Sequence, residues 1–171
     1  MSEPKPSPTH AIGLESPVGP LAVHERDGAI VAVSWEHPRR EQETPLLAAA
    51  KVQLDGYFFC GLRRFELPLA PEGSDFDRKV WEAMLRIPFG QTRSYGEIAR
   101  EVGGNARDVG GACGRNPIPI IIPCHRVLAS GGRIGGYSAP GGVTTKRFLL
   151  ELEGAATSAD AETLPLPLTP P

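Results

Sequence analysis

The sequence predicts a two-domain α/β protein, in which a small sheet with one packed helix precedes a mainly helical domain. Three observations predict this arrangement. Short β-rich runs separated by Gly and Pro crowd residues 10–35, capped helical patterns begin after Thr44 and after Ser74, and a Pro/Gly stretch at 71–74 separates the two parts. The 171 residues, 40% of them hydrophobic, suffice for one ordinary domain or two small ones.

The first domain is expected to cover residues 10–70. Runs 21–24 and 29–33 are rich in β-branched and apolar residues, as strands are. Thr44 followed by a proline is typical of a helix start, and Gly61 ends the helical pattern. Residues 65–69 are then expected to form an edge strand.

The second domain is expected to cover residues 75–154 and to contain a helix-turn-helix. Ser74 caps its first helix, and Ser94 opens a short second helix with a capping box. Asn105 caps a further helix at 106–114, after a tight glycine turn. Two short helices joined in this way are typical of a helix-turn-helix. Thr144 or Thr145 is expected to begin the last helix.

The helix at 106–114 is unusual because nearly all of its side chains are small. Glycine weakens a helix by up to ~1 kcal/mol relative to alanine. A helix so poor in side chains lets its backbone approach another surface closely, and that surface is either another helix or a narrow DNA groove.

Composition excludes several other classes. No apolar run approaches the ~20 residues that span a membrane, and residues 1–9 lack an apolar signal segment and are expected to be flexible. Three unpaired cysteines fit free thiols in a reduced, cytoplasmic setting, without metal ligands. Residues 155–171, rich in Ala, Thr and Pro, are expected to be a disordered tail.

The charge is unevenly distributed along the chain. The net charge is −2, yet residues 92–147 carry eight cations and three acids, which gives +5 there and leaves −7 elsewhere. A basic segment on an acidic chain fits an anionic ligand that binds at one surface, although it also fits a solvated face of mixed charge.

The sequence Pro123-Cys124-His125-Arg126-Val127 follows the apolar run 118–122. A stiff apolar segment can hold a cysteine still, and the adjacent His and Arg supply a base and positive charge. Such surroundings lower the pKa of a thiol and activate it as a nucleophile.

Several short motifs between residues 74 and 154 occur in an order that resembles one known family. They are Val80-Trp81, Ile87-Pro88-x-Gly90-x-Thr92-x-Ser94-Tyr95-Gly96, Ala106-Arg107-x-Val109-Gly110, Asn116-Pro117, the pentapeptide at Cys124, Gly136-Tyr137 and Leu149-Leu150-x-x-Glu153. The ordered set resembles the O6-alkylguanine-DNA alkyltransferases. Ser16-Pro17-x-Gly19-Pro20 also resembles the opening turn of that family's first domain.

The resemblance implies a reaction centred on one thiol. Cys124 would accept the alkyl group from guanine O6, or from thymine O4, in a single turnover that consumes the protein. His125 would act as base through a bridging water. Glu153 would orient His125, and Asn116 would brace the surrounding turn.

The resemblance also implies a DNA-binding surface. The residues expected to contact the substrate or DNA are Tyr95, Arg107, Arg126, Val127, Tyr137 and Ser138. Arg107 would enter the base stack as the damaged nucleotide leaves it, and Tyr95 would press on the phosphate. The helix at 106–114 would lie in the minor groove, and Tyr137 would hydrogen-bond the extruded guanine.

The family's architecture implies a ribonuclease H-like first domain and a winged-helix-like second one. The expected partner is double-stranded DNA that contains O6-alkylguanine. A monomer without cofactor, metal, membrane or obligatory protein partner is expected.

Three features depart from the family pattern. The turn before Arg107 is about two residues shorter than expected, Asp108 follows where a small apolar residue is usual, and the loop at 137–142 is longer. Asp108 places negative charge near phosphates, so we expect it to weaken DNA binding in a salt-dependent way.

Two other functions remain possible on the sequence. A binder of alkylated DNA that lacks the reaction resembles this fold, but typically has Trp in place of the thiol. A cysteine hydrolase would need turnover and an oxyanion hole. Stable alkylation of Cys124 without turnover distinguishes these possibilities.

Overall fold

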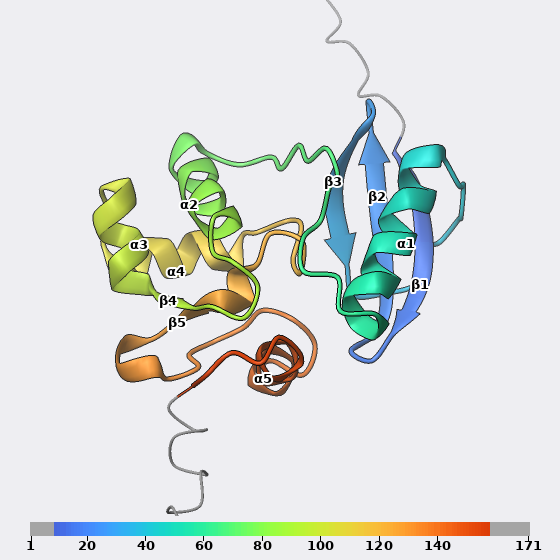
Figure 1. Ribbon diagram of the computed structural model, residues 1–171. Helices are drawn as coiled ribbons and strands as arrows, with labels where there is room; N and C mark the ends of the chain where they lie inside the picture. The colour runs from blue at the N-terminus through green and yellow to red at the C-terminus, as the bar shows by residue number, and fades with distance from the viewer. Residues whose placement is uncertain (1–8, 158–171) are drawn as a thin grey trace, which may run out of the picture.

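The computed structural model describes residues 9–157 and places a three-stranded sheet beside a group of helices (Figure 1). We refer to residues 9–74 as the N-terminal part and to residues 75–157 as the C-terminal part. Among the described residues, no helix combines the length and apolar character that crossing a bilayer requires.

The N-terminal part contains an antiparallel meander covered by one helix. Its strands β1 (His10–Ser16), β2 (Gly19–Arg26) and β3 (Ala29–Ser34) are hydrogen-bonded in chain order. Helix α1 (Pro45–Phe59) packs on one face of the sheet (Figure 1). The side chain of Thr44 accepts a hydrogen bond from the first turn of α1, which confirms the predicted cap.

The predicted edge strand at 65–69 is wrong. Only Leu69 pairs with the sheet, through an isolated parallel bridge to Ile30. Pro68 precedes it and has no N–H to donate to a ladder, so pairing cannot extend through this segment. The chain there runs as an extended connection toward the C-terminal part (Figure 1).

The C-terminal part holds four α-helices. They are α2 (Asp75–Leu85), α3 (Tyr95–Val102), α4 (Ala106–Gly114) and α5 (Val143–Leu152). The predicted caps Ser74, Ser94 and Asn105 each accept a hydrogen bond from the backbone of the helix that follows. Gly103 ends α3 in the left-handed conformation, with φ +83°, which turns the chain sharply into α4.

A short ladder joins the helix pair to the thiol segment. Strand β4 (Arg93–Ser94) runs parallel to β5 (Val127–Leu128), and β5 follows directly on the 3₁₀ turn Cys124–Arg126. Because Tyr95 follows β4, the ladder holds the start of α3 beside Cys124.

One hydrophobic core runs through both parts, from Ile12 in the sheet to Leu149 in α5. Ala155 belongs to a smaller cluster with Leu128 and Leu150, and Thr157 is buried. Packing therefore continues past residue 154, where the sequence predicts a disordered tail to begin. Residues 1–8 and 158–171, on which the rest of the predicted flexible termini falls, lie outside the described residues. The exact domain boundaries and the ribonuclease H-like and winged-helix-like assignments stay predictions.

Candidate active site

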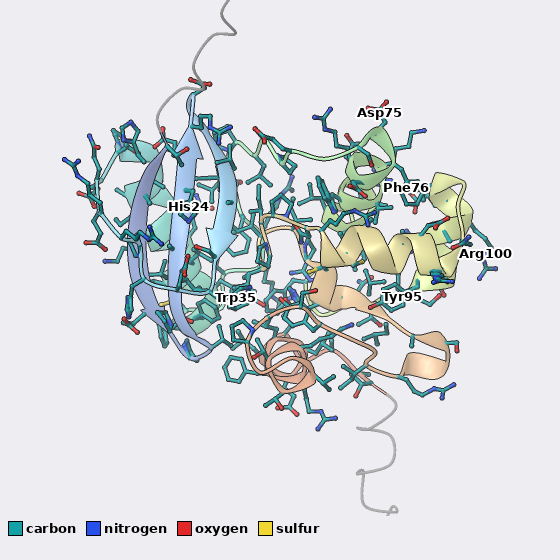
Figure 2. All side chains as sticks on the ribbon, turned by 180° about the vertical axis from the view of Figure 1, so that it is seen from behind. His24, Trp35, Asp75, Phe76, Tyr95 and Arg100 are labelled. Atoms are coloured by element: carbon teal, nitrogen blue, oxygen red, sulfur yellow. The ribbon has the colours of Figure 1, made fainter. Side chains whose placement is uncertain are left out.

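A cavity of about 570 Å³ brings together six of the ten residues that the sequence singles out. They are Tyr95, Arg107, Asn116, Cys124, Tyr137 and Ser138. Trp35, which follows β3 in the N-terminal part, also lines the cavity. Figure 2 shows Trp35 where the sheet meets the helical part, and Tyr95 below α4. His125, Arg126, Val127 and Glu153 are not among the lining residues.

The segment before Cys124 is a tightly fixed turn. Asn116 Oδ1 accepts a hydrogen bond from the Ile118 amide at 2.9 Å, and Asn116 Nδ2 donates to the Ile122 carbonyl at 2.9 Å. Ile120 has φ +73°, which a β-branched residue rarely adopts. Such a conformation persists only where the surroundings impose it, so the Asn116 bonds brace a strained turn that presents the thiol.

The Cys124 thiol is only 6% exposed, and this burial raises its pKa. Hydrogen bonding from Asn116, the Lys146 charge and the Tyr137 hydroxyl act in the opposite direction. The sequence pattern indicates Arg126 as the positive charge beside the thiol, whereas the charge that acts on the thiol in the structure is that of Lys146. The 3₁₀ turn carries the Arg126 side chain to the buried Glu153 carboxylate, and the role of His125 as a base stays a prediction.

Lys146 is a residue of the site that sequence reasoning missed. It lies in α5 and is fully buried. Its Nζ atom donates to the Val127 carbonyl at 2.7 Å, and to the Gly136 carbonyl and the Tyr95 hydroxyl at 3.3 Å each. Burial lowers the pKa of Lys146 to about 8. The sequence offers little signal for this role, because lysine is seldom buried and the residue counts as a surface cation.

His125 is completely buried, and its Nε2 atom lies 2.6 Å from Oε2 of Glu153. Burial lowers the pKa of His125, so the imidazole is neutral in the resting protein. A neutral imidazole that donates from Nε2 to a carboxylate leaves Nδ1 as a proton acceptor. The Nδ1 atom is buried and has no hydrogen-bond partner among the described residues.

Arg126 is buried and does not line the cavity, and its expected contact with DNA stays a prediction. Its guanidinium donates to both oxygens of Glu153, with Nε 2.8 Å from Oε1, and to the Ile87 carbonyl at 2.7 Å. Burial alone would raise the pKa of Glu153, but the hydrogen bonds from His125 and Arg126, together with the Arg126 charge, outweigh it and lower this pKa to about 2. The carboxylate is therefore ionised, and Arg126 neutralises it.

Tyr137 places its hydroxyl next to the thiol. Burial first, and then the Cys124 charge, raise the Tyr137 pKa well above its ordinary value. The hydroxyl oxygen is buried and has no well-aligned hydrogen-bond partner among residues 9–157. Its ring meets the Trp35 ring edge-on, with centroids 6.2 Å apart. Val127 is buried, and its carbonyl oxygen accepts the Lys146 hydrogen bond.

The residues of α4 include some that are buried in the core and some that line the cavity. Val109 and Ala112 are buried in the core, whereas Gly110 and Gly114 line the cavity. A Cβ atom added to Gly110 would meet no atom within 4 Å. The protein's own packing therefore does not require glycine at this position, which favours close approach by an external surface over packing against another helix.

The basic segment is less positive than its sequence indicates. Arg93 pairs with Glu101, Arg115 with Asp77, and Arg126 with Glu153. The exposed cations that remain in this segment outside those pairs are Arg100, Arg107, Arg133 and Arg147. Among the described residues, no group of three or more His, Cys, Asp or Glu side chains is placed to hold a metal ion.

Comparison with known proteins agrees with this geometry. Residues 75–155 match the family model described as 6-O-methylguanine DNA methyltransferase, DNA binding domain. The methylated-DNA–protein-cysteine methyltransferase of Mycobacterium tuberculosis is 42% identical over 160 residues, which are 88% of this chain and 96% of the relative. The same enzyme of Methanosarcina acetivorans is 40% identical over 83% of this chain and 96% of its own length.

A solved structure shares the fold over most of the chain. The crystal structure of Mycobacterium tuberculosis OGT in complex with DNA superposes with a TM-score of 0.77 at 40% identity, covering 85% of this chain and 92% of that one. The chain belongs to the family of methylated-DNA–protein-cysteine methyltransferases, and it is a DNA-binding enzyme of alkylation repair.

Proposed function

We propose that this protein, acting as a monomer, takes the alkyl group from O6 of a guanine in duplex DNA, and from O4 of thymine, onto Cys124. The observation that carries the proposal is the cavity, because Cys124 and Arg107 line it together with the glycine face of α4, which consists of Gly110 and Gly114. Its volume of about 570 Å³ lies within the range of small-molecule sites, so it has room for one base.

The alkylated base must leave the stack, because a thiol recessed in a cavity cannot reach a base inside a duplex. Arg107 is exposed at the rim of the cavity and is the side chain that takes the place of the base. Tyr95 lines the same cavity and turns the nucleotide by contact with its phosphate. Ser138, also at the lip, hydrogen-bonds the extruded base.

The transfer is one in-line displacement. The sulfur of Cys124 forms a bond to the alkyl carbon while the bond from that carbon to O6 breaks, and the electron pair stays on guanine. His125 accepts the thiol proton at Nδ1 through one water, and Glu153 stabilises the imidazolium that results. The departing guanine takes up a proton, so that the proton lost by the thiol is balanced overall. The protein keeps the alkyl group as a thioether and reacts once.

Tyr137 and Lys146 assist this step electrostatically. Because the Tyr137 pKa is raised, its hydroxyl keeps its proton and donates a hydrogen bond to the departing guanine. The Lys146 ammonium favours the thiolate over the thiol, which offsets part of the cost of ionising a buried sulfur.

Transfer rates from alkylated duplexes and from the free base test the proposal. Wild-type protein is mixed with a duplex carrying O6-methylguanine, or with the free O6-methylguanine base, and methylated protein is followed over time. A duplex with O4-methylthymine is expected to methylate the same cysteine. If the protein aligns an extruded base, the duplex reacts roughly 100-fold faster than the free base.

Arg107→Ala separates base extrusion from the chemistry. We expect it to slow the duplex reaction about tenfold and to leave the free-base reaction unchanged. Arg64→Ala, another exposed arginine that lies outside this cavity, serves as the matched control. Equal rates from duplex and free base, or an Arg107→Ala variant that slows both, would contradict the proposal.

A further inference from the structure

Tyr57 lies in α1 of the N-terminal part and is 1% exposed. Its ring is held among three phenylalanine rings, with centroid separations of 5.2 Å to Phe58, 5.5 Å to Phe65 and 6.1 Å to Phe89. Phenylalanine would satisfy such packing equally well. A buried hydroxyl destabilises the fold unless it has a hydrogen-bond partner, so the tyrosine oxygen calls for an explanation of its own.

The Tyr57 hydroxyl donates to Oε2 of Glu153 at 2.6 Å, across 96 residues of sequence. Burial and the Glu153 carboxylate raise the pKa of Tyr57 far above its ordinary value, so the hydroxyl acts only as a donor. Figure 1 shows the end of α1 that carries this contact close to α5, whose last turn leads into Glu153.

Glu153 Oε2 is also the oxygen that lies 2.6 Å from His125 Nε2. The other donors to the carboxylate are Arg126 and the Gly90 amide, at 3.2 Å. Those donors and His125 all belong to the C-terminal part. Among the donors found within residues 9–157, Tyr57 is the one that the N-terminal part contributes.

We propose that Tyr57 is a positioning residue for alkyl transfer, through which the N-terminal part fixes the Glu153 carboxylate and thereby the His125 imidazole. Tyr57 does not line the cavity, so it acts through Glu153 rather than on the substrate. A carboxylate held by a second donor keeps the orientation in which it stabilises the imidazolium, whereas a freed carboxylate turns on its side chain. The inference rests on the proposed roles of His125 and Glu153.

Tyr57→Phe tests it, because the variant keeps the ring and removes only the donor. Transfer from an O6-methylguanine duplex is measured at increasing duplex concentrations. We expect the maximal rate constant to fall about tenfold. The duplex concentration at half-maximal rate should not change, and each protein should still accept one methyl group.

These readouts separate positioning from folding. A variant that is merely destabilised loses the fraction of protein able to react, and the rate constant of the remainder is unchanged. Phe58→Leu is the matched control, since Phe58 packs on the Tyr57 ring in the same helix and donates nothing to Glu153. It should lower the melting temperature without changing the rate constant.

Glu153→Gln, alone and combined with Tyr57→Phe, completes the test. If Tyr57 acts through Glu153, Tyr57→Phe slows the wild type but adds nothing further to Glu153→Gln. An undiminished rate in Glu153→Gln would refute the proposed roles of His125 and Glu153, and the Tyr57 inference with them. A slow Glu153→Gln beside a Tyr57→Phe with the wild-type rate would refute the Tyr57 inference alone.

Proton NMR tests the same inference in the protein without DNA. The proton shared by His125 Nε2 and Glu153 should give a downfield resonance, because the heavy atoms are only 2.6 Å apart. Tyr57→Phe is expected to move this resonance, and Phe58→Leu is not. An identical shift in both variants would show that ring packing is responsible and would overturn the inference.

Discussion

Nε2 of His125 lies 2.6 Å from Oε2 of Glu153, although 28 residues separate the two in the chain. Both side chains are completely buried. The contact fixes which imidazole nitrogen carries the proton and leaves Nδ1 free, so one hydrogen bond prepares the histidine for its proposed role as a base. Glu153 is a shared hydrogen-bond acceptor, because Arg126 and Tyr57 donate to the same carboxylate as His125.

Glu153 should make the stability of the protein depend on pH. Its pKa is about 2 in the folded protein, below the ~4.3 of an unfolded glutamate. The ionised group therefore stabilises the fold fully above pH ~4.3, and this contribution is lost as the pH falls toward 2. Glu153→Gln should lower the free energy of unfolding by a few kcal/mol at pH 7, partly because the buried Arg126 charge loses the carboxylate that neutralises it.

Urea unfolding at pH 7 and pH 3 checks this prediction. The difference between wild type and Glu153→Gln should shrink markedly at pH 3. Glu101→Gln, which removes an exposed carboxylate paired with arginines, is the control and should have little effect at either pH. A gap between wild type and Glu153→Gln that is equally large at both pH values would show that the carboxylate charge is not what stabilises the site.

Gly110 should matter for DNA and not for folding. Because a Cβ there meets no atom within 4 Å, Gly110→Leu should fold, and α4 should gain up to ~1 kcal/mol in helix propensity. If the glycine face of α4 enters a groove, the added side chain should weaken duplex binding at least about tenfold.

Fluorescence anisotropy with a labelled duplex measures the effect of Gly110→Leu. Ala49→Leu adds similar bulk to an exposed position of α1 and should leave affinity unchanged. Full affinity in Gly110→Leu would mean that another surface contacts the DNA.

Asp108 should weaken DNA binding through its charge. The residue is exposed in the first turn of α4, where its amide donates to the Asn105 cap at 2.8 Å. Asp108→Ala should raise duplex affinity a few-fold at low salt, and the gain should fade as salt is added. The helix loses about 0.3–1 kcal/mol of dipole stabilisation in exchange.

Asp75→Ala is the matched control for this change. Asp75 is also an exposed acid in the first turn of a helix, but it lies in α2, on the far side of α4 from Tyr95 (Figure 2). Titrations at two salt concentrations should separate the two variants. Equal affinity of Asp108→Ala and wild type at low salt would show that the charge at this position is neutral for binding.

Local chemistry allowed much of the fold to be predicted. Four helix starts follow from short-range side-chain hydrogen bonds, and Thr44, Ser74, Ser94 and Asn105 all cap helices as predicted. The last helix was predicted to begin at Thr144 or Thr145, but α5 begins at Val143 without a side-chain cap. The edge strand at 65–69 failed, because strand pairing depends on distant partners and Pro68 removes a donor. The start of the predicted tail failed for a similar reason, since Ala155 packs against Leu128 and Leu150.

The candidate active site, like the fold, could be predicted only in part from the sequence. The motif around Cys124 indicated the thiol, and the resemblance supplied the residues that line the cavity. The directions of side chains that follow one another were not predictable, because a 3₁₀ turn sends Arg126 toward Glu153 and Cys124 toward the cavity. Nor could the sequence show that the Tyr57 hydroxyl has its hydrogen-bond partner 96 residues away.

The identity of the acceptor atom is the central claim, and intact mass measures it directly. Wild type, Cys124→Ser and Cys113→Ser are each incubated with a duplex carrying one O6-methylguanine, and methylated peptides are mapped. Cys113 is the relevant control because it lines the same cavity, where burial raises its pKa to about 12. The account predicts one added methyl group on Cys124 in wild type and in Cys113→Ser, and none in Cys124→Ser. Methylation of Cys124→Ser, or tight binding without any change in mass, would contradict it.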